Sequence, residues 1–335
     1  MTDGKRHVIF ASDDRGFEPL QVAVYSLLAS ADASRPLTVS VLTGCRPLSP
    51  EHRGSLEALG GRFPFVRLEV IDCDGLLADR LASFNDDAVW GRMAWARCLI
   101  SDLFPEEHGN IVYLDIDTFV CRDLAELYDL DLGDNVLAAV PEERRETGTL
   151  HDPIWTNGLL DGRAEYYCNS GVLVMNVDAF RRETLLDRIC TWYTGHRGQV
   201  IRPDQDTLNS LFWDRIVRLH PRFNHCDGWL ERQLKEDPGA AFWRGNTPKE
   251  VLEAVSDPAV LHFWGPKKPW RWNHRPEGAR YAKAMRELGV LHGELPGSGF
   301  WRRLESGLFA VYHALLRRVV ARRLRRLNPS DYGIM

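Results

Sequence analysis

Two carboxylates directly after a short apolar run are the residues of this sequence best suited to chemistry. Asp115 and Asp117 follow Ile111-Val112-Tyr113-Leu114 and are separated by Ile116. Side chains two apart on an extended backbone point the same way, so both carboxylates can reach one cation. Oxygen ligands of this kind suit Mg²⁺ or Mn²⁺, which also bind phosphate oxygens. The pair therefore predicts a divalent metal site, although the same tripeptide is also common in solvated loops.

A histidine followed by glycine and lysines forms a second candidate group far downstream. His262 ends the apolar run Val260-Leu261, and Gly265, Lys267 and Lys268 follow among aromatic residues. An imidazole nitrogen can complete a metal site, a lysine can neutralise a diphosphate, and glycine permits close backbone approach. A lone histidine at a strand end is more often a core residue with its hydrogen bonds satisfied. The adjoining lysines and aromatic residues favour the functional interpretation here.

Two more segments place polar residues beside apolar ones. Asp204 and Gln205 open a polar run that precedes Leu211-Phe212-Trp213. This run is either the first turn of a helix, where acids interact favourably with the helix dipole, or a set of groups that bind sugar hydroxyls. Asn169 stands at the start of a further apolar run, for which an ordinary strand entry is the simpler interpretation.

The apolar runs that must position these residues are short and regularly interrupted. A helix is expected at Leu20–Leu28, and another is expected to carry Leu99, Ile100 and Leu103 on one face. The expected strands are Val8–Phe10, Thr38–Leu42, Val66–Ile71, Ile111–Leu114, Val136–Val140, Gly171–Asn176 and Val260–Phe263. Strands alternating with helices predict an α/β fold with a mostly parallel central sheet, whose sites lie at the carboxyl ends of strands.

Composition restricts the class of protein. The 335 residues are 44% hydrophobic and 27% charged, which is ordinary for a globular protein. The formal net charge of -5 gives no reason to expect a nucleic-acid partner. The 7 cysteines form no C-x-x-C pair, which argues against a disulfide framework or zinc cluster and favours a reducing compartment. With no signal-peptide pattern and no apolar run of membrane-spanning length, we expect a cytoplasmic protein.

The last part of the chain differs from the rest. Leu295-Pro296-Gly297-Ser298-Gly299 is typical of a domain end, so we expect a catalytic domain at 1–290 and a tail at 291–335. Between Trp301 and Leu327, apolar residues recur at helical intervals among paired arginines, and Pro329 marks the stop. This pattern predicts a basic amphipathic helix that binds an anionic membrane surface, the inner face of the cell membrane. The alternatives are a helix docked on its own domain and an oligomer contact.

Taken together, these segments resemble one family, the retaining glycosyltransferases of family 8. The group includes bacterial lipopolysaccharide galactosyl- and glucosyltransferases and glycogenin. The resemblance runs from about His7 to about His274, and its five elements occur in the family's order. They are Ala-Ser-Asp-Asp at 11–14, Ala96-Arg97 ahead of Tyr-Leu-Asp-Ile-Asp at 113–117, Asn-Ser-Gly-Val-Leu at 169–173, Asp-Gln-Asp-Thr-Leu-Asn at 204–209, and His-Phe-Trp-Gly-Pro-Lys-Lys-Pro-Trp at 262–270.

The resemblance implies a GT-A fold, a UDP-hexose donor carrying galactose or glucose, and Mn²⁺, with Mg²⁺ as the other possible ion. It implies a glycan or lipid-linked acceptor such as lipopolysaccharide or another cell-surface polysaccharide. By matching position, Asp115, Asp117 and His262 resemble the metal ligands. The positions that resemble nucleotide contacts are Ala11, Asp13, Asp115, Ile116, Asp117, Gly265 and Lys268. The positions that resemble catalytic residues around the donor hexose are Arg97, Asn169, Asp204 and Gln205.

The sequence departs from the family pattern in two places. Relatives often carry a tyrosine after Asp14 that stacks on uracil, whereas this chain continues Arg15-Gly16-Phe17, so Phe17 is the candidate ring. Glu142 stands where many relatives have an aspartate near the sugar, which leaves the hexose open. The alternative functions are a non-catalytic nucleotide-sugar- or glycan-binding member and, less favoured because Gly16 stands alone, a nucleotidyltransferase. Front-face attack and double displacement both stay open as mechanisms.

Overall fold

The computed structural model describes residues 6–81, 84, 92–141, 167–200, 202–226, 247–265, 268–270 and 278–290, and seven positions between 308 and 322. The chain divides into two compact units, each built from several segments. The first unit comprises residues 1–18, 32–116 and 124–219, and the second comprises 19–31, 117–123 and 220–335. The expected boundary between residues 290 and 291 stays a prediction.

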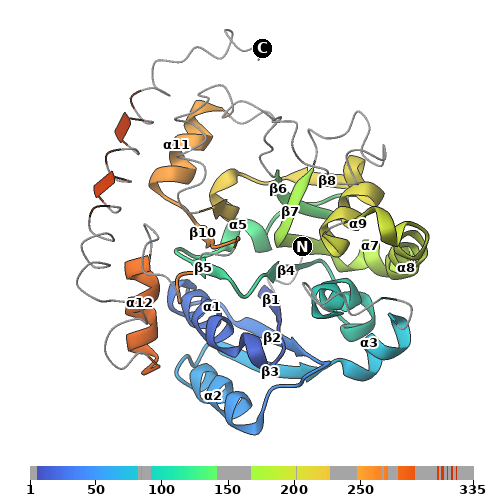
Figure 1. Ribbon diagram of the computed structural model, residues 1–335, viewed down its shortest axis with the longest axis horizontal. Helices are drawn as coiled ribbons and strands as arrows, with labels where there is room; N and C mark the ends of the chain where they lie inside the picture. The colour runs from blue at the N-terminus through green and yellow to red at the C-terminus, as the bar shows by residue number, and fades with distance from the viewer. Residues whose placement is uncertain are drawn as a thin grey trace. The chain divides into compact units, whose positions relative to one another are not determined.

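A seven-stranded sheet is the centre of the first unit, with the strand order β3-β2-β1-β4-β7-β6-β8. Its strands are β1 (Arg6–Ala11), β2 (Leu37–Thr43), β3 (Val66–Asp72), β4 (Asn110–Leu114), β6 (Leu137–Pro141), β7 (Cys168–Asn176) and β8 (Ile216–Arg218). All neighbouring strands are parallel except β7, which runs antiparallel to β4 and β6 (Figure 1). The mostly parallel sheet is confirmed.

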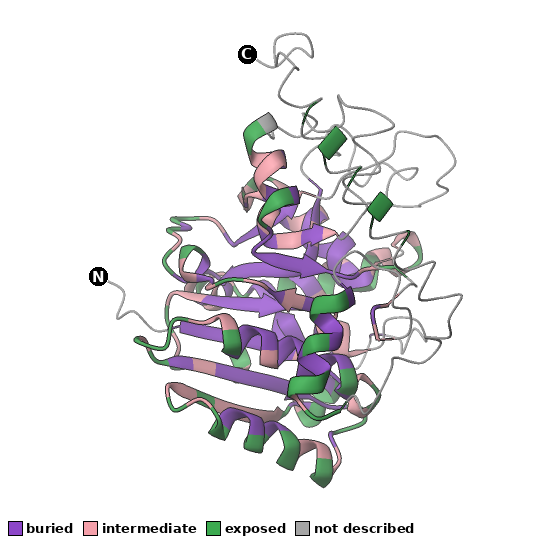
Figure 2. Cartoon of the chain, turned by 90° about the vertical axis from the view of Figure 1, so that its left-hand side faces the viewer, coloured by how far each residue is buried: buried purple, intermediate pink, exposed green. Residues whose placement is uncertain are grey.

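Strands β1 and β4 form where the sequence is continuously apolar, because they are buried on both faces of the sheet. Val8, Ile9 and Phe10 of β1 are fully buried, as are Val112 and Leu114 of β4. Figure 2 shows the same burial along most strands of this sheet. The sheet is therefore a rigid platform on which strand ends can hold side chains in fixed positions.

Helices of the first unit connect and cover the strands. Helix α2 begins at Pro50 after the cap residue Ser49, whose hydroxyl accepts the His52 backbone N–H, and it buries Leu56 and Leu59. The helix expected near Leu99 is present as a 3₁₀ helix followed by a short α-helix. The helical elements are η1 (Asp14–Gly16), α2 (Pro50–Gly61), α3 (Asp74–Arg80), η2 (Arg92–Leu99), α4 (Ile100–Leu103), α5 (Ala125–Tyr128), α7 (Val177–Arg182), α8 (Leu185–His196), η4 (Arg197–Gln199), α9 (Pro203–Phe212) and η5 (Trp213–Arg215).

The second unit is built on a separate three-stranded sheet of order β5-β10-β9. The strand expected at Val260–Phe263 is present as β10, but it lies here rather than in the central sheet, because it pairs antiparallel with β5. The elements of this unit are α1 (Phe17–Ser30, from Pro19 onward), β5 (Thr118–Val120), η6 (Pro221–Asn224), β9 (His225–Cys226), α11 (Pro248–Ser256), β10 (Val260–His262) and α12 (Gly278–Glu287).

The apolar core of the second unit fixes the loop around β10. Leu261 and Phe263 pack in one buried cluster with Val22 of α1 and Tyr281 of α12. The Ser26 hydroxyl accepts the backbone N–H of Val120 at 2.9 Å, which ties α1 to β5. The residues on either side of His262 are therefore held in a packed core.

The described positions of the tail are helical and exposed. They are Leu308, Val311, Tyr312, Leu315, Arg318, Val319 and Arg322. The apolar ones among them are 44% to 64% exposed and recur every three or four residues. The expected amphipathic helix stays a prediction. Among the described residues, no helix has the length and apolar character required to cross a membrane.

Candidate functional site

The end of β4 carries the first group of candidate residues. The backbone N–H of Asp115 donates to the Gly171 carbonyl of β7 at 2.8 Å. Because β7 is antiparallel to β4, it is the amino end of β7, with Asn169 and Ser170, that lies beside the carboxyl end of β4. Asn169 thus lies at the start of its strand, as expected from the sequence.

Arg97 of η2 links this strand end to α9. Its guanidinium donates to the Ser170 carbonyl at 2.6 Å and to Asp115 Oδ1 at 3.0 Å, and it lies 3.3 Å from Asp204 Oδ2. The side chain is only 5% exposed. Burial lowers the pKa of Arg97, but the neighbouring Asp204 and Asp115 more than offset this and raise it. Arg97 is thus a permanent buried cation that orients Asp115.

The amino-terminal turn of α9 meets β7 at Ser170. The Ser170 hydroxyl donates to Asp204 Oδ2 at 3.0 Å, and its backbone N–H donates to Gln205 Oε1 at 3.1 Å. Burial raises the pKa of Asp204, and the positive charge of Arg97 opposes that rise. Asn169 contributes through a local bond, since its Oδ1 accepts the Gly171 N–H at 2.9 Å. The four residues expected around the donor hexose are thus brought together in one unit.

Ser170 was not singled out from the sequence, although it holds Arg97, Asp204 and Gln205 in place. Tyr113 was missed in the same way: its hydroxyl donates to Asp115 Oδ1 at 2.7 Å, and its ring lies 4.0 Å from the Arg97 guanidinium. The available signal was the two-residue spacing of Tyr113 and Asp115, which puts both side chains on one face of the strand.

Asp117, in the second unit, is surrounded by three groups from the β10 region. Asp117 Oδ1 lies 3.1 Å from His262 Nε2, and the Lys268 ammonium donates to Asp117 Oδ2 at 2.5 Å. The Phe263 N–H donates to the Asp117 carbonyl at 2.9 Å. Burial favours a raised pKa for Asp117, but His262 and Lys268 outweigh it and hold that pKa far below its ordinary value. Asp117 is therefore a carboxylate anion.

The ring of His262 is oriented by Asn224. His262 Nδ1 lies 2.8 Å from Asn224 Oδ1, which accepts the Nδ1 proton. With Nδ1 hydrogen-bonded in this way, Nε2 is the ring nitrogen that faces the Asp117 carboxylate. A hydrogen-bonded Nδ1 of this kind is the usual support of a metal-binding histidine.

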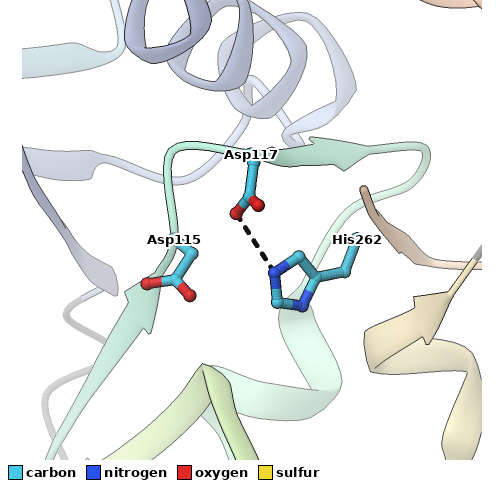
Figure 3. A group of neighbouring side chains, drawn as sticks. All are labelled: Asp115, Asp117 and His262. Carbon is cyan, nitrogen blue, oxygen red and sulfur yellow. Dashed lines mark hydrogen bonds and ion pairs between the residues drawn. The ribbon is translucent and has the colours of Figure 1, made fainter. Parts of the chain in front are cut away.

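Asp115, Asp117 and His262 form a candidate metal centre (Figure 3). One ligand atom from each lies within 4.8 Å of the others. Residues 115–117 form a turn after β4 rather than the extended segment expected from the sequence. The carboxylates converge because this turn leads into β5, which pairs with the strand carrying His262. Two carboxylates and one imidazole fit a small divalent cation such as Mn²⁺ or Mg²⁺.

At the end of β1, where a base pocket is expected, the ring of Phe17 is packed differently from what the sequence suggests. Asp13, which follows Ala11 and Ser12, accepts the N–H groups of Arg15 and Gly16. Phe17 stacks on His52 with ring centroids 3.8 Å apart and is 9% exposed, so one face of the candidate stacking ring is already covered. Phe17 is therefore a poor replacement for a base-stacking tyrosine.

The remaining expectations concern two glycines, Ile116 and one glutamate. Gly265 has a φ of +85°, a conformation that favours glycine, directly after the His262 strand. A Cβ on Gly16 would meet the Ile116 side chain at 2.8 Å, so these two positions are closely packed. Glu142 lies outside the described residues.

Comparison with known proteins identifies the family to which this chain belongs. General stress protein A of Bacillus subtilis (strain 168) is 26% identical over 270 residues, covering 80% of this chain and 88% of its own. The lipopolysaccharide 1,3-galactosyltransferase of Salmonella typhimurium is 25% identical over 270 residues, covering 78% of this chain and 72% of its own. The crystal structure of the galactosyltransferase LgtC with donor and acceptor sugar analogs is 27% identical, with a TM-score of 0.67, covering 88% of this chain and 99% of that one.

A family profile also matches most of the chain. The family described as "Glycosyl transferase family 8" matches residues 7–274, a span that includes both candidate groups of residues described above. Its structural relatives have the GT-A fold, whose mostly parallel central sheet is the one found in the first unit. Because the match extends over most of the chain, this protein belongs to glycosyltransferase family 8.

Proposed function

We propose that this protein is a metal-dependent, retaining hexosyltransferase that uses a UDP-hexose donor. The observation that carries the proposal is the convergence of Asp115, Asp117 and His262 at the three positions where the family has its metal ligands. The proposed ion is Mn²⁺, with Mg²⁺ as the alternative. When bound, such an ion acts as a Lewis acid and stabilises negative charge on the leaving diphosphate.

The side chain of Lys268 is placed to assist the same leaving group. The side chain is 23% exposed, and its ammonium donates to Asp117 Oδ2 and to the Phe263 carbonyl. A flexible point charge of this kind can turn from a carboxylate to a phosphate oxygen. A Cβ added at Gly265 would have no atom within 4 Å, so the backbone there is open to a ligand. Together they supply preorganised positive potential where charge develops in the transition state.

The proposed mechanism is front-face attack, with Gln205 stabilising the positive charge that develops on the hexose. The two carboxylates of α9 are held by other groups: Asp204 pairs with Arg97 and Ser170, and Asp206 accepts from Tyr167 and from the Arg202 N–H. A carboxylate held in this way is poorly placed to attack the donor first. This arrangement supports retention without a durable covalent intermediate.

The donor hexose is proposed to be galactose or glucose, and the acceptor a glycan or glycolipid. Relatives at 25% and 26% identity carry the names lipopolysaccharide 1,3-galactosyltransferase and lipopolysaccharide glucosyltransferase WaaO. Those names support lipopolysaccharide or another cell-surface polysaccharide as the acceptor.

The tail is proposed to hold the enzyme on the inner face of the cell membrane. Leu308, Val311, Leu315 and Val319 leave apolar side chains exposed on a helix whose sequence is rich in arginine. Such a helix lies in the membrane interface, with its apolar side toward the acyl chains and its cations at anionic headgroups. A lipid-linked acceptor would be presented at that surface.

The main alternative is a non-catalytic member that binds a nucleotide sugar or glycan. The metal-ligand set and the buried Arg97–Asp204 pair favour catalysis, because a binding module has no need of a preorganised site for a charged leaving group. A nucleotidyltransferase is less well supported, since Gly16 packs against Ser12 and Ile116 instead of opening a glycine-rich phosphate loop.

A donor screen tests the proposal. The full-length protein is incubated with UDP-galactose, UDP-glucose and GDP-mannose, with and without Mn²⁺, and the released sugar is followed by proton NMR. We expect hydrolysis of a UDP-hexose only with the metal, and the α anomer as the first sugar formed. A first-formed β anomer contradicts retention, and turnover of none of the donors favours the non-catalytic alternative.

A further inference from the structure

A buried hydrogen-bond chain lies next to Gln205 in the first unit. The Tyr167 hydroxyl lies 2.5 Å from Asp206 Oδ1, and Gln205 Nε2 donates to the same hydroxyl at 2.8 Å. Tyr167, Asp206 and Gln205 are 2%, 0% and 4% exposed. The other oxygen of Asp206 accepts the Arg202 N–H at 2.9 Å. Tyr167 and Asp206 have no role in the function proposed so far.

The direction of every hydrogen bond in this chain is fixed by chemistry. A carboxylate only accepts, so the Tyr167 proton points at Asp206 and the hydroxyl lone pair must receive an N–H from Gln205. At the other end of the amide, the backbone N–H of Ser170 only donates, so the atom facing it, 3.1 Å away, must be Oε1. Both ends therefore specify the same orientation of the Gln205 amide.

The chain also affects the charge on the amide oxygen. Each hydrogen bond in a low-dielectric interior polarises the next, and here the series starts from the negative charge of Asp206. Donation from Nε2 to a hydroxyl that itself donates to an anion draws the amide toward its charge-separated form, with more negative charge on Oε1. An oxygen of that kind is suited to a positively charged sugar.

We propose that Tyr167 is a positioning residue that, backed by Asp206, fixes and polarises the Gln205 amide so that its oxygen meets the charge developing on the donor hexose. The inference rests on the proposed function, because it requires Gln205 to act in the transition state. It adds two residues, Tyr167 and Asp206, to those that determine the rate of the transfer step.

The test is a comparison of Tyr167→Phe, Gln205→Ala and the double variant, with full-length protein, Mn²⁺ and the UDP-hexose that the wild type turns over. Tyr167→Phe keeps the ring and removes only the hydroxyl. We expect kcat to fall roughly 10- to 100-fold while the KM of the donor stays within about twofold, because the interaction acts in the transition state. Tyr193→Phe, at another buried tyrosine that is 1% exposed, is the control and should keep the wild-type kcat.

The double variant separates positioning from general destabilisation. Because Tyr167 acts through Gln205, adding Tyr167→Phe to Gln205→Ala should change kcat by less than about twofold. Wild-type kcat in Tyr167→Phe, or full additivity in the double variant, overturns the inference. If Tyr167→Phe is not recovered folded, Asp206→Asn carries the same test: a lowered, non-additive kcat supports the inference and an unchanged kcat overturns it. A wild type that turns over no donor overturns the proposed function itself, and this inference with it.

Discussion

At the scale of single residues, Arg97 is the group that orders the side chains around Asp115 and Asp204. It is buried, and it pairs with Asp115 and Asp204. A buried ion pair gains little overall, because desolvation offsets most of the attraction, but removal of one partner leaves the other charge buried without compensation. Removal of Arg97 should therefore cost more stability than removal of an arginine that makes two ion pairs at the surface.

The first prediction is that Arg97→Met lowers the free energy of unfolding by about 3–5 kcal/mol, because Asp204 stays buried without its cation. Urea denaturation followed by fluorescence measures the change. Arg67→Met is the control, because Arg67 is 78% exposed and its pair with Glu69 contributes about 1 kcal/mol or less. Equal losses in the two variants would argue against the buried pair.

The polar residues of the segments that match the family could be predicted from the sequence, whereas Ser170 and Tyr113, which hold them, could not. Asp115, Asp117, Asp204 and Gln205 lie in segments whose composition is unusual and whose order matches a family. Ser170 acts through its backbone and one hydroxyl, and such contacts depend on which strand lies beside β4. That neighbour is β7, which lies far from β4 in the sequence, so no local pattern indicates the pairing.

At the scale of elements, the loop after β10 places Lys268 beside Asp117. Gly265 is the position where that loop takes a positive φ, +85°. The surrounding space is open, so the requirement for glycine comes from the backbone and not from crowding. The conformation of this loop sets how far the Lys268 ammonium stands from the metal ligands.

The second prediction is that Gly265→Ala costs about 1–2 kcal/mol in stability and raises the KM of the donor, because relief of the strain moves the loop away from Asp117. Steady-state kinetics and thermal unfolding measure the two effects. Gly289→Ala is the matched control, since Gly289 has a φ of +74° with equally open space. That variant should lose similar stability and keep its KM. A normal KM in Gly265→Ala would contradict this role of the loop.

Strands could be predicted wherever an apolar run was continuous, and sheet membership could not. The runs at β1 and β4 gave the correct positions because parallel strands covered on both faces are apolar throughout, and those at β2 and β3 did so through apolar residues at every second position. The antiparallel direction of β7 and the position of β10 in a separate small sheet both depend on pairing with strands far away in the sequence. The short strand β5, only three residues long, carries no periodic signal.

At the scale of the whole molecule, the tail is the part with the most exposed apolar surface among the described residues. Its five exposed apolar positions are Leu308, Val311, Tyr312, Leu315 and Val319. These exposed apolar residues on a basic helix are the observation on which the proposed membrane contact rests. The charge favours an anionic partner.

The third prediction is that truncation after Ser298 releases the protein from vesicles containing anionic lipid and spares hydrolysis of the soluble donor. The effect follows from the loss of the cations, each of which contributes about 1 kcal/mol near such a surface. Sedimentation with vesicles in low salt measures the binding. In the full-length protein, Leu315→Asp should weaken binding in the same direction. Equal binding by truncated and full-length protein would rule out the membrane role.

The central claim, that Asp115, Asp117 and His262 hold a metal on which donor cleavage depends, is tested most directly by one titration. The rate of UDP-hexose hydrolysis is measured against Mn²⁺ concentration for the wild type, Asp117→Asn and the exposed control Asp79→Asn. We predict saturable activation of the wild type and Asp79→Asn, and a loss of roughly 100-fold or more in Asp117→Asn, because removal of the charge stabilising the leaving group costs about 2.7 kcal/mol or more. Full turnover in the presence of chelator, or a normal Mn²⁺ response in Asp117→Asn, would contradict the claim.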